Sequence, residues 1–419
     1  MSSHYTWKNG PDIIKQHSIA KHKILKTYLA KYYATLVGDR PRSEFKLTVI
    51  DGFAGGGEYY HEETGELILG SPHICLQEAQ IAEFEINKNR SNKVRFDITH
   101  IFVEAMKPAF QFLTKSLHER GYGSFIGQSI QLRHGKFEDE VDSIIEFIQK
   151  KTPKSGRSIF ILDQFGYKDV STDIMRRIFS KLDKAEIILT FGVDSLFNFA
   201  NEVNLNQNLS RINVPNVFAN QTIEKIKESE KNWRGFVQST LYQALMGEVK
   251  AKHYTPFFIN NSKGHGVYWL VHLSQHHRAR SVMTDVHWGH QTNFSHYGGA
   301  GLDMFNMLGY DPRFDNEFQQ QSMFAFDKLS EDASISKMME QIPRLISNMK
   351  EGCTFGEFYE GTCNQTPASL LIYKKCLELL IGHHEILVES SSGTIRSKAH
   401  RIELTDRISK YPMASLFLP

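Results

Sequence analysis

A glycine-rich turn that follows an apolar stretch is the part of this sequence best suited to bind a ligand. Residues 46–50 are largely apolar and partly β-branched, as is typical of a buried parallel strand, and Asp51 ends them. Four glycines then follow within six residues, and glycine allows sharp turns and close approach of the backbone to a ligand. In α/β folds the carboxyl edge of the sheet binds nucleotide-like molecules. The spacing Asp51-x-x-x-Gly55-x-Gly57 therefore predicts a cofactor-binding turn that contains Asp51, Phe53, Gly55 and Gly57.

The next acid along the chain distinguishes between two cofactors. A dinucleotide fingerprint needs a third glycine at residue 60 and an acid about 20 residues further on. Residue 60 is Tyr60, and the next acid that ends a predicted strand is Glu104. The turn instead matches the D/E-x-x-x-G-x-G pattern of S-adenosylmethionine (SAM) methyltransferases, in which the second acid accepts hydrogen bonds from both ribose hydroxyls. The sequence thus predicts SAM as the cofactor and Glu104 as its ribose ligand, and a turn without a ligand is the alternative.

The stretch Asp163-Gln164-Phe165-Gly166 ends another predicted strand, where methyltransferases of exocyclic amines carry D/N-P-P-Y/F. In that motif a polar side chain and a backbone carbonyl accept hydrogen bonds from the target amine, while the aromatic ring stacks on the base. We predict Asp163 and Phe165 as the catalytic residues. The stretch departs from the motif, because Gln164 replaces the first proline and Phe165 comes one position early. An acid that caps the following helix is the alternative for Asp163.

A further cofactor contact is predicted after the third strand of the sheet. Glu138 and Asp139 lie shortly after that strand, where a side chain often contacts the adenine of SAM. Either acid could serve, and we assign the contact to Glu138. Acids are also favoured in the first turn of a helix by the helix dipole, so a helix start is the alternative.

The histidines and cysteines are not spaced as metal ligands. Metal ligation requires converging side chains that are themselves held by hydrogen bonds, and scattered histidines are more often core or surface residues. The later histidines are His272, His276, His277, His287, His290 and His296. The four cysteines, Cys75, Cys353, Cys363 and Cys376, lack C-x-x-C spacing and are too few for a disulfide framework. We predict no metal site.

Alternating strands and helices must position the candidate site. Hydrophobic patterning predicts strands over residues 46–50, 95–103, 129–133, 158–162 and 186–191 and helices over 18–37, 72–87, 108–120, 138–151 and 172–183. Such alternation predicts a mostly parallel sheet with helices on both faces. A strand pair over 254–260 and 267–273 adds a terminal antiparallel hairpin. The expected fold is α/β, the Rossmann-like fold of SAM methyltransferases.

The chain is predicted to have three parts. Residues 1–40 form an N-terminal helical extension, residues 41–300 the methyltransferase-like domain with a helical insertion at about 196–250, and residues 301–419 a helical linker and a winged-helix-like domain. Within the insertion, residues 198–220 lack a clear period and are a candidate lid.

The winged-helix prediction rests on helices followed by a β-wing. The helices are expected over 324–349 and 367–381, and short strands over 386–389 and 401–404. Basic side chains on the helix and wing, which could contact phosphates, are Lys374, Lys375, Arg396, Lys398, His400 and Arg401. We therefore consider nucleic acid a possible partner of this domain, with protein docking as the alternative.

Composition sets only broad limits on function. The 419 residues are 41% apolar and 23% charged, as in globular proteins with a sizeable core. The formal net charge is only +2, so any basic surface must be local. No signal-peptide pattern opens the sequence, and no apolar run reaches the roughly 18 residues of a membrane span. We expect a cytoplasmic protein without a membrane partner.

Several of these stretches together resemble the three-Cys-motif partner (TcmP) family. The stretches are Lys21-His22-x-x-Leu25-x-x-Tyr28-Leu29, the turn at 51–59, Gly70-Ser71-Pro72, Asp163-Gln164-Phe165-Gly166 and Tyr268-Trp269-Leu270-Val271-His272. The resemblance covers about residues 7–300. It implies a bacterial or phage-linked protein with a methyltransferase-like fold and a separate radical-SAM-like partner that carries three cysteines. It implies no substrate.

Two hypotheses about function follow. The first is a SAM-dependent methyltransferase that acts on nucleic acid, most simply on an exocyclic base amine. The second is a non-catalytic partner protein that uses the methyltransferase fold to dock the radical-SAM-like protein. The altered stretch after Asp163 motivates the second hypothesis, because the expected proline is absent.

Overall fold

The computed structural model describes residues 7, 10–38, 42–164, 169–192, 210, 244–260, 267–290, 294–296, 301–302, 324–325, 328–349 and 351–412. The chain forms two compact units, residues 1–286 and 287–419. Phe165, the candidate lid at 198–220 except Ser210, and most of the predicted insertion at 196–250 lie outside the described residues.

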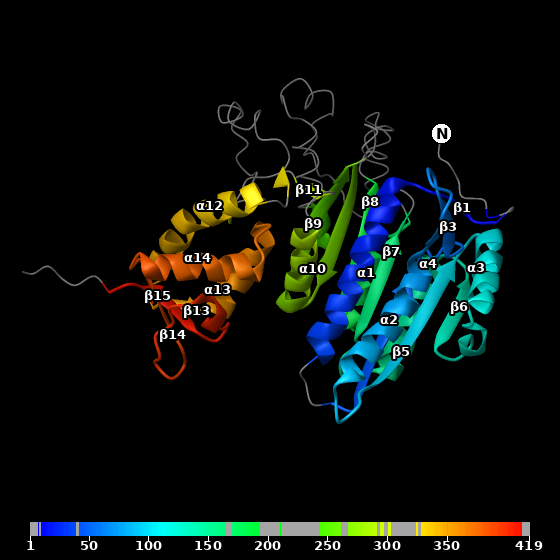
Figure 1. Cartoon of the computed structure of the whole chain (residues 1–419), viewed down its shortest axis with the longest axis horizontal. Coiled ribbons are helices and arrows are strands. Elements are labelled where there is room, and N and C mark those ends of the chain that lie inside the picture. The colour runs from blue at the N-terminus through cyan, green and yellow to red at the C-terminus, as the bar shows by residue number, and fades with distance from the viewer. Residues whose placement is uncertain are drawn as a thin grey trace, which may run out of the picture. The chain divides into compact units, whose positions relative to one another are not determined.

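The first unit is built on a mostly parallel sheet (Figure 1). Its strands are β2 (Glu44–Asp51), β5 (Arg95–Glu104), β6 (Ile130–His134), β7 (Ser158–Asp163), β8 (Ala185–Gly192), β9 (His253–Asn260) and β10 (Val267–Ser274). They are ordered β9-β10-β8-β7-β2-β5-β6. The five strands from β8 to β6 run parallel, whereas β10 is antiparallel to both β8 and β9. This is the Rossmann-like order of SAM-dependent methyltransferases, with its terminal antiparallel hairpin, so the predicted fold is confirmed.

Helices cover both faces of this sheet (Figure 1). They are α1 (Gln16–Val37), α2 (Ser71–Lys88), α3 (Lys107–Glu119), α4 (Phe137–Lys151), α5 (Thr172–Lys181) and α10 (His277–Gly289). The crossovers through α2 and α3 advance along the sheet in one direction, and those through α4 and α5 return in the other. Because parallel crossovers are right-handed, the two sets lie on opposite faces. Helix α1 packs beside α2 on the first face.

The central strands are buried on both sides, which explains their continuous apolar sequences. Leu47, Val49 and Ile50 of β2 and Phe160 and Leu162 of β7 are all fully buried. Strand β2 pairs with β5 on one side and β7 on the other, so Asp51, at its end, lies between the ends of two neighbouring strands. The sheet thereby brings the strand-end acids of the candidate site to one edge.

A small second sheet follows the glycine turn directly. It contains β1 (Asp12–Ile14), β3 (Glu58–His61) and β4 (Leu67–Leu69) in the order β1-β3-β4. The sequence of residues 61–70 is largely polar, as is typical of a loop, but β3 and β4 form an antiparallel hairpin around it. The polar residues 62–66 are only its turn, in which Gly65 adopts a positive φ of 66°. The polarity of the turn therefore conceals the strands on either side of it.

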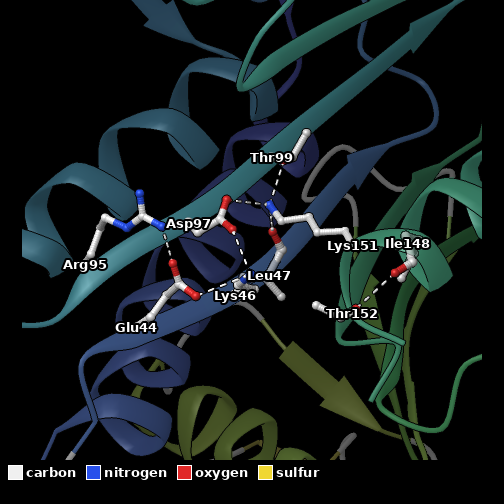
Figure 2. A network of polar contacts seen from close by, with 9 residues as sticks. All are labelled: Glu44, Lys46, Leu47, Arg95, Asp97, Thr99, Ile148, Lys151 and Thr152. Atoms are coloured by element: carbon white, nitrogen blue, oxygen red, sulfur yellow. Dashed lines mark hydrogen bonds and ion pairs between the residues drawn. The ribbon is translucent and has the colours of Figure 1, made fainter. Parts of the chain in front are cut away.

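A polar network ties the C-terminal end of α4 to strands β2 and β5, away from the strand-end acids (Figure 2). The ammonium of Lys151 donates hydrogen bonds to the carbonyl of Leu47 at 3.1 Å and to Thr99 Oγ1 at 2.7 Å, and it lies 3.1 Å from Asp97 Oδ1. The Lys151 side chain is only 10% exposed. Its burial lowers the pKa of Lys151, and Asp97 opposes this effect. The network fixes the beginning of β2 and β5 against the end of α4.

The second unit has winged-helix architecture. Its helices are α12 (Lys328–Ser347), α13 (Phe355–Thr362) and α14 (Leu370–Gly382), and its strands β13 (Cys353–Thr354), β14 (Ile386–Glu389) and β15 (Arg407–Lys410) form a sheet of order β13-β15-β14. Two further short strands, β11 (Phe294–His296) and β12 (Phe324–Ala325), pair with each other. Buried side chains from all three helices and from β14 and β15 share one core.

The second strand of the wing was predicted too early. Residues 399–401 form a single 3-10 turn, and the strand that pairs with β14 begins at Arg407. The buried carboxylate of Asp406 determines this geometry, because it accepts hydrogen bonds from the backbone of Glu403 and from Arg396. In the described part of the chain, no helix combines the length and apolar character that crossing a membrane requires.

Candidate functional site

The glycine turn is held between the ends of three strands. The backbone amide of Gly52 donates a hydrogen bond to the Ile161 carbonyl of β7 at 2.9 Å, and that of Ala54 donates to the Val103 carbonyl of β5 at 3.0 Å. Gly55 and Gly57 then adopt φ values of +59° and +81°, which are unfavourable for residues that carry a Cβ atom. The turn predicted from sequence therefore lies at the carboxyl edge of the parallel sheet.

Protein side chains pack closely against the glycines of this turn. A Cβ atom at Gly57 would lie 2.8 Å from Leu113 Cδ1, and one at Gly56 would overlap the indole ring of Trp7. Trp7 is 5% exposed and makes an edge-to-face contact with Tyr59 at 4.9 Å between ring centroids. Internal packing thus requires these glycines whether or not a ligand binds, so the glycines alone are weak evidence for a cofactor.

Glu104 provides the more informative feature of the turn. It ends β5, and its Oε2 accepts a hydrogen bond from the backbone amide of Gly55 at 2.8 Å, while its Oε1 accepts one from Met106 at 2.6 Å. Burial raises the pKa of the Glu104 carboxyl, and the two backbone amides oppose this effect. The carboxylate is therefore held in one orientation at the turn. The two residues predicted to bind the same cofactor, Gly55 and Glu104, are in direct contact.

Asp51 is a fully buried acid at the start of the turn. Its Oδ1 accepts a hydrogen bond from the Phe53 amide at 3.1 Å, and no hydrogen bond of normal geometry from the described residues reaches its Oδ2. The pKa of Asp51 is raised to about 7, mainly by burial and also by the nearby carboxylates of Asp163 and Glu104, while the Ser71 hydroxyl and the Phe53 amide oppose the rise. Three acids therefore share one edge of the sheet, and Asp51 is the most easily protonated.

Asp163, the predicted catalytic acid, forms an ion pair with Lys21 of α1. The Lys21 ammonium lies 2.5 Å from Oδ1 and 2.6 Å from Oδ2, so one cation engages both oxygens. The Lys21 side chain is 10% exposed and that of Asp163 is 33% exposed. Burial acts to raise the pKa of Asp163, but Lys21 and Thr190 outweigh it, so the net pKa lies below the ordinary value. Asp163 is thus a carboxylate at neutral pH.

Two histidines of α1 lie beside this ion pair. Burial lowers the pKa of His17 and His22 to about 4. The charge of Lys21 also lowers it, whereas Asp163 acts to raise it. Both rings are therefore neutral near pH 7. They add hydrogen-bonding capacity to this edge of the sheet without adding charge.

Glu138 occupies a different environment from the other predicted cofactor residues. It lies in the first turn of α4, is exposed, and has its carboxylate 3.4 Å from the ammonium of Lys136. The structure brings Asp51, Gly55 and Glu104 together, whereas Glu138 shares only the sheet edge with them. Its contact with adenine remains a prediction.

The basic residues of the winged helix are partly neutralised by acids of the same unit. Arg396 lies 3.0 Å from Asp406, Lys398 lies 3.2 Å from Glu378, and Lys375 is paired with Glu331. His400 and Arg401 are exposed. The expected phosphate-binding surface is therefore smaller than the number of basic residues suggests.

The histidines and cysteines do not converge within the described residues. No group of three His, Cys, Asp or Glu side chains with the arrangement of a metal site occurs there. His272 instead belongs to a buried hydrogen-bonded cluster with Tyr28 and Glu186. Cys75, Cys363 and Cys376 are buried free thiols, and Cys353 is half-buried.

Comparison with known proteins gives one family match, which lies within the second unit. Residues 309–393 match the family described as the GMT-like wHTH domain, a winged helix-turn-helix domain. No curated protein matches the sequence significantly.

Solved structures with a similar arrangement are distant. They include protein LPL1258 from Legionella pneumophila (11% identity, 61% of this chain and 85% of that one, TM-score 0.36). They also include the O-methyltransferase TomG from Streptomyces achromogenes in complex with SAM (10%, 63% and 92%, 0.30) and the plantazolicin methyltransferase BamL in complex with SAH (13%, 62% and 85%, 0.24). At these TM-scores the likeness carries no argument, and the fold assignment rests on the strand order.

Two residues at the site were not predicted to take part in it. Lys21 lies 142 positions from Asp163, and the amphipathic pattern of its helix shows only that one face is buried. Trp7 precedes the first regular element, where the sequence has no period to interpret. The available signal for this ion pair was the position of Lys21 on the buried face of α1, because a buried ammonium requires an acidic partner.

Proposed function

We propose that this protein is a SAM-dependent methyltransferase that acts on nucleic acid, most simply on an exocyclic base amine. One observation carries the proposal. The carboxylate that ends β5, Glu104, is hydrogen-bonded to Gly55 of the glycine turn that ends β2, within a methyltransferase fold. In this proposal Glu104 would hold the ribose of SAM, and the glycine turn would hold its methionine part.

The residues at this edge fit such a cofactor. Asp51 Oδ2 is a buried acceptor without a normal hydrogen bond from the described residues, and Glu104 presents a fixed carboxylate for hydroxyl donors. Asp51, Gly55, Gly57 and Glu104 would hold SAM, with Trp7 forming an aromatic wall beside the turn. When bound, SAM would supply an electrophilic methyl group.

Asp163 would orient the substrate amine. The Lys21 ammonium keeps Asp163 ionised, and each carboxylate oxygen still has a lone pair available for an N–H donor. Lys21 is then a positioning residue, because it acts only through Asp163. The winged helix-turn-helix match at 309–393 supports a nucleic-acid substrate, since this class of domain commonly binds duplexes through a helix.

Calorimetry on the full chain with SAM and with S-adenosylhomocysteine tests cofactor binding. We expect both to bind, and we expect Glu104→Gln to weaken binding by roughly tenfold or more, since hydrogen bonds to a charged group are lost. Glu119→Gln, in which the replaced side chain is 62% exposed, serves as the matched control. A folded sample that binds neither compound contradicts the proposal.

Methyl transfer to DNA and RNA oligonucleotides from labelled SAM tests the substrate class. Asp163→Ala should abolish transfer while cofactor binding stays intact. Transfer that survives this substitution would remove Asp163 from the mechanism. Transfer to neither nucleic acid, with SAM bound, would leave the cofactor assignment and remove the substrate assignment.

A second candidate function is favoured by the same ion pair. Both oxygens of Asp163 are already engaged by Lys21, and Trp7 packs against the turn. A non-catalytic methyltransferase-like protein of the TcmP type, which docks a radical-SAM-like three-Cys protein, is compatible with both features. Absence of SAM binding together with a stable complex in co-purification would favour this function over the first.

A further inference from the structure

A cavity lies at the edge of the sheet opposite the glycine turn. Its volume is about 230 Å³, and it is bounded by α1, α10, the beginning of β8 and the end of β10. Glu186 pairs with Ser274 across β8 and β10, whereas Asp163 of the candidate site pairs with Thr190, four residues further along β8. At about 3.3 Å per residue, the two sites are about 13 Å apart along the strand.

The bottom of the cavity combines apolar walls with two polar groups. Tyr32, Ala185, Glu186, Ala279 and Val282 all line it, and each is less than a tenth exposed. No hydrogen bond of normal geometry from the described residues reaches the buried Tyr32 hydroxyl. Burial and the Glu186 carboxylate raise the pKa of Tyr32, whereas the charge of Arg157 and a longer side-chain contact from Arg157 to the hydroxyl oppose this effect, so the hydroxyl is neutral. A buried hydroxyl of this kind is costly unless a ligand or water completes it.

Glu186 is held in place from the side away from the cavity. Its Oε2 accepts a hydrogen bond from the Tyr28 hydroxyl and lies 3.2 Å from His272 Nε2. Burial raises the pKa of Tyr28 well above its usual range, so Tyr28 remains a neutral donor. Among the described residues, every hydrogen bond to the Glu186 side chain uses Oε2, so Oε1 can still accept one. A fixed carboxylate and the Tyr32 hydroxyl therefore line the same cavity.

The mouth of the cavity is basic. Lys184 and Arg278 line it and are exposed, and Arg157 lines it while half-buried. Asp183 is the acidic residue among the exposed lining residues. The cavity thus offers an N–H acceptor and a hydroxyl at its bottom, apolar walls between, and positive charge at its entrance.

We propose that this cavity binds a nucleotide. A base that carries a ring N–H, such as guanine, would donate to Glu186 Oε1 and meet the Tyr32 hydroxyl, and its phosphate would lie at Lys184 and Arg278. The same chemistry could come from a free nucleotide or from the end of a strand. This inference does not depend on the proposed methyltransferase activity.

Calorimetry on the full chain with GMP, guanosine and inorganic phosphate tests the proposal. GMP should bind more tightly than guanosine, and phosphate alone should bind weakly. Tyr32→Phe should weaken GMP and guanosine equally, by roughly three- to tenfold, since it removes one neutral hydrogen bond. It deletes only a hydroxyl that lacks a normal hydrogen bond in the described structure, so the fold should be kept. Glu186→Gln should weaken both ligands by roughly tenfold or more.

The mouth is tested separately from the bottom. Arg278→Gln should reduce the affinity for GMP severalfold and leave guanosine unchanged, and Lys115→Gln on α3, whose side chain is 68% exposed, is the matched control. A 5′-phosphorylated RNA dinucleotide that binds as well as GMP identifies a strand end as the ligand, and selective binding of GMP identifies a free nucleotide.

Failure of this inference differs from failure of the proposed function. The inference is overturned, even if SAM binds, when neither GMP nor guanosine binds. It is also overturned when both bind equally well to wild type, Tyr32→Phe and Glu186→Gln. If SAM does not bind but Tyr32→Phe weakens the affinity for GMP, only the cofactor assignment is overturned.

Discussion

Replacing Lys21 by methionine tests how the candidate catalytic acid is held. The substitution keeps the length and apolar contacts of the side chain and removes the cation that touches both oxygens of Asp163 at 2.5 and 2.6 Å. A carboxylate that is one-third exposed then loses its main partner, while Thr190 and solvent remain. We expect the protein to fold with lower stability.

The size of the loss follows from the geometry and the burial of the pair. At 2.5 Å and an effective dielectric constant of 20, the attraction is about 7 kcal/mol before desolvation is subtracted. Exposed pairs contribute about 0–1 kcal/mol, and removal of one partner from a fully buried pair costs about 3–5 kcal/mol. Lys21 is 10% exposed and Asp163 33% exposed, so an intermediate loss of about 2 kcal/mol is expected. That corresponds to a decrease in melting temperature of about 4–8 °C.

A double-mutant cycle measures the pair itself. Urea unfolding at pH 7.5 of wild type, Lys21→Met, Asp163→Asn and the double variant should give a coupling energy above about 1 kcal/mol. The folded-state pKa of Asp163 lies below its ordinary 3.8, so its stabilisation is present above pH 3.8 and is lost as the pH falls through the folded pKa. The difference between wild type and Lys21→Met should therefore shrink towards pH 3. Additive losses, or a difference that does not change with pH, would refute the reasoning.

Three further predictions concern stability and packing. Asp51 has a pKa raised from 3.8 to about 7, so stability should fall as the pH rises from about 4 to about 7. Asp51→Asn should therefore be more stable than wild type at pH 8, by up to about 4 kcal/mol, in urea titrations that show no gain at pH 4. Lys151→Met should lower the free energy of unfolding by about 1–2 kcal/mol, because three polar contacts are lost, whereas Lys46→Met, at a side chain 44% exposed, should change it by less than about 0.5 kcal/mol. Gly56→Ala should displace Trp7 and shift tryptophan emission to longer wavelength, and a shift that persists unchanged in a Trp7→Phe background would contradict the packing.

The fold could be predicted from sequence because its signals are local. Strands β2, β7 and β8 each contain a short apolar run, and the acids Asp51, Glu104 and Asp163 end β2, β5 and β7. Parallel strands bring such ends to one edge, so the neighbourhood of Gly55 and Glu104 follows from the alternation of strands and helices.

What the sequence could not predict depends on contacts across long separations or on polar segments that form strands. The ion pair of Lys21 and Asp163 joins residues 142 positions apart, and no local period specifies a partner. The polar turn at residues 62–66 is longer than either strand of the hairpin of β3 and β4, so the local composition is that of a loop. In the wing, the buried Asp406 organises a turn where apolar residues suggested a strand.

Helix α1 connects the two sites. Lys21 reaches Asp163, Tyr28 reaches Glu186, and Tyr32 lines the nucleotide cavity. Positions seven and eleven residues apart lie on one face of an α-helix, and at 1.5 Å per residue the three side chains span about 16 Å of the sheet. Both polar anchors are ionic or charge-assisted and largely buried, so sliding the helix by even one residue would leave carboxylates without partners at both edges. The register of α1 on the sheet is therefore specified by these polar contacts together with its buried apolar face. A ligand in the cavity that contacts Tyr32 therefore contacts the same face of α1 from which Lys21 holds Asp163.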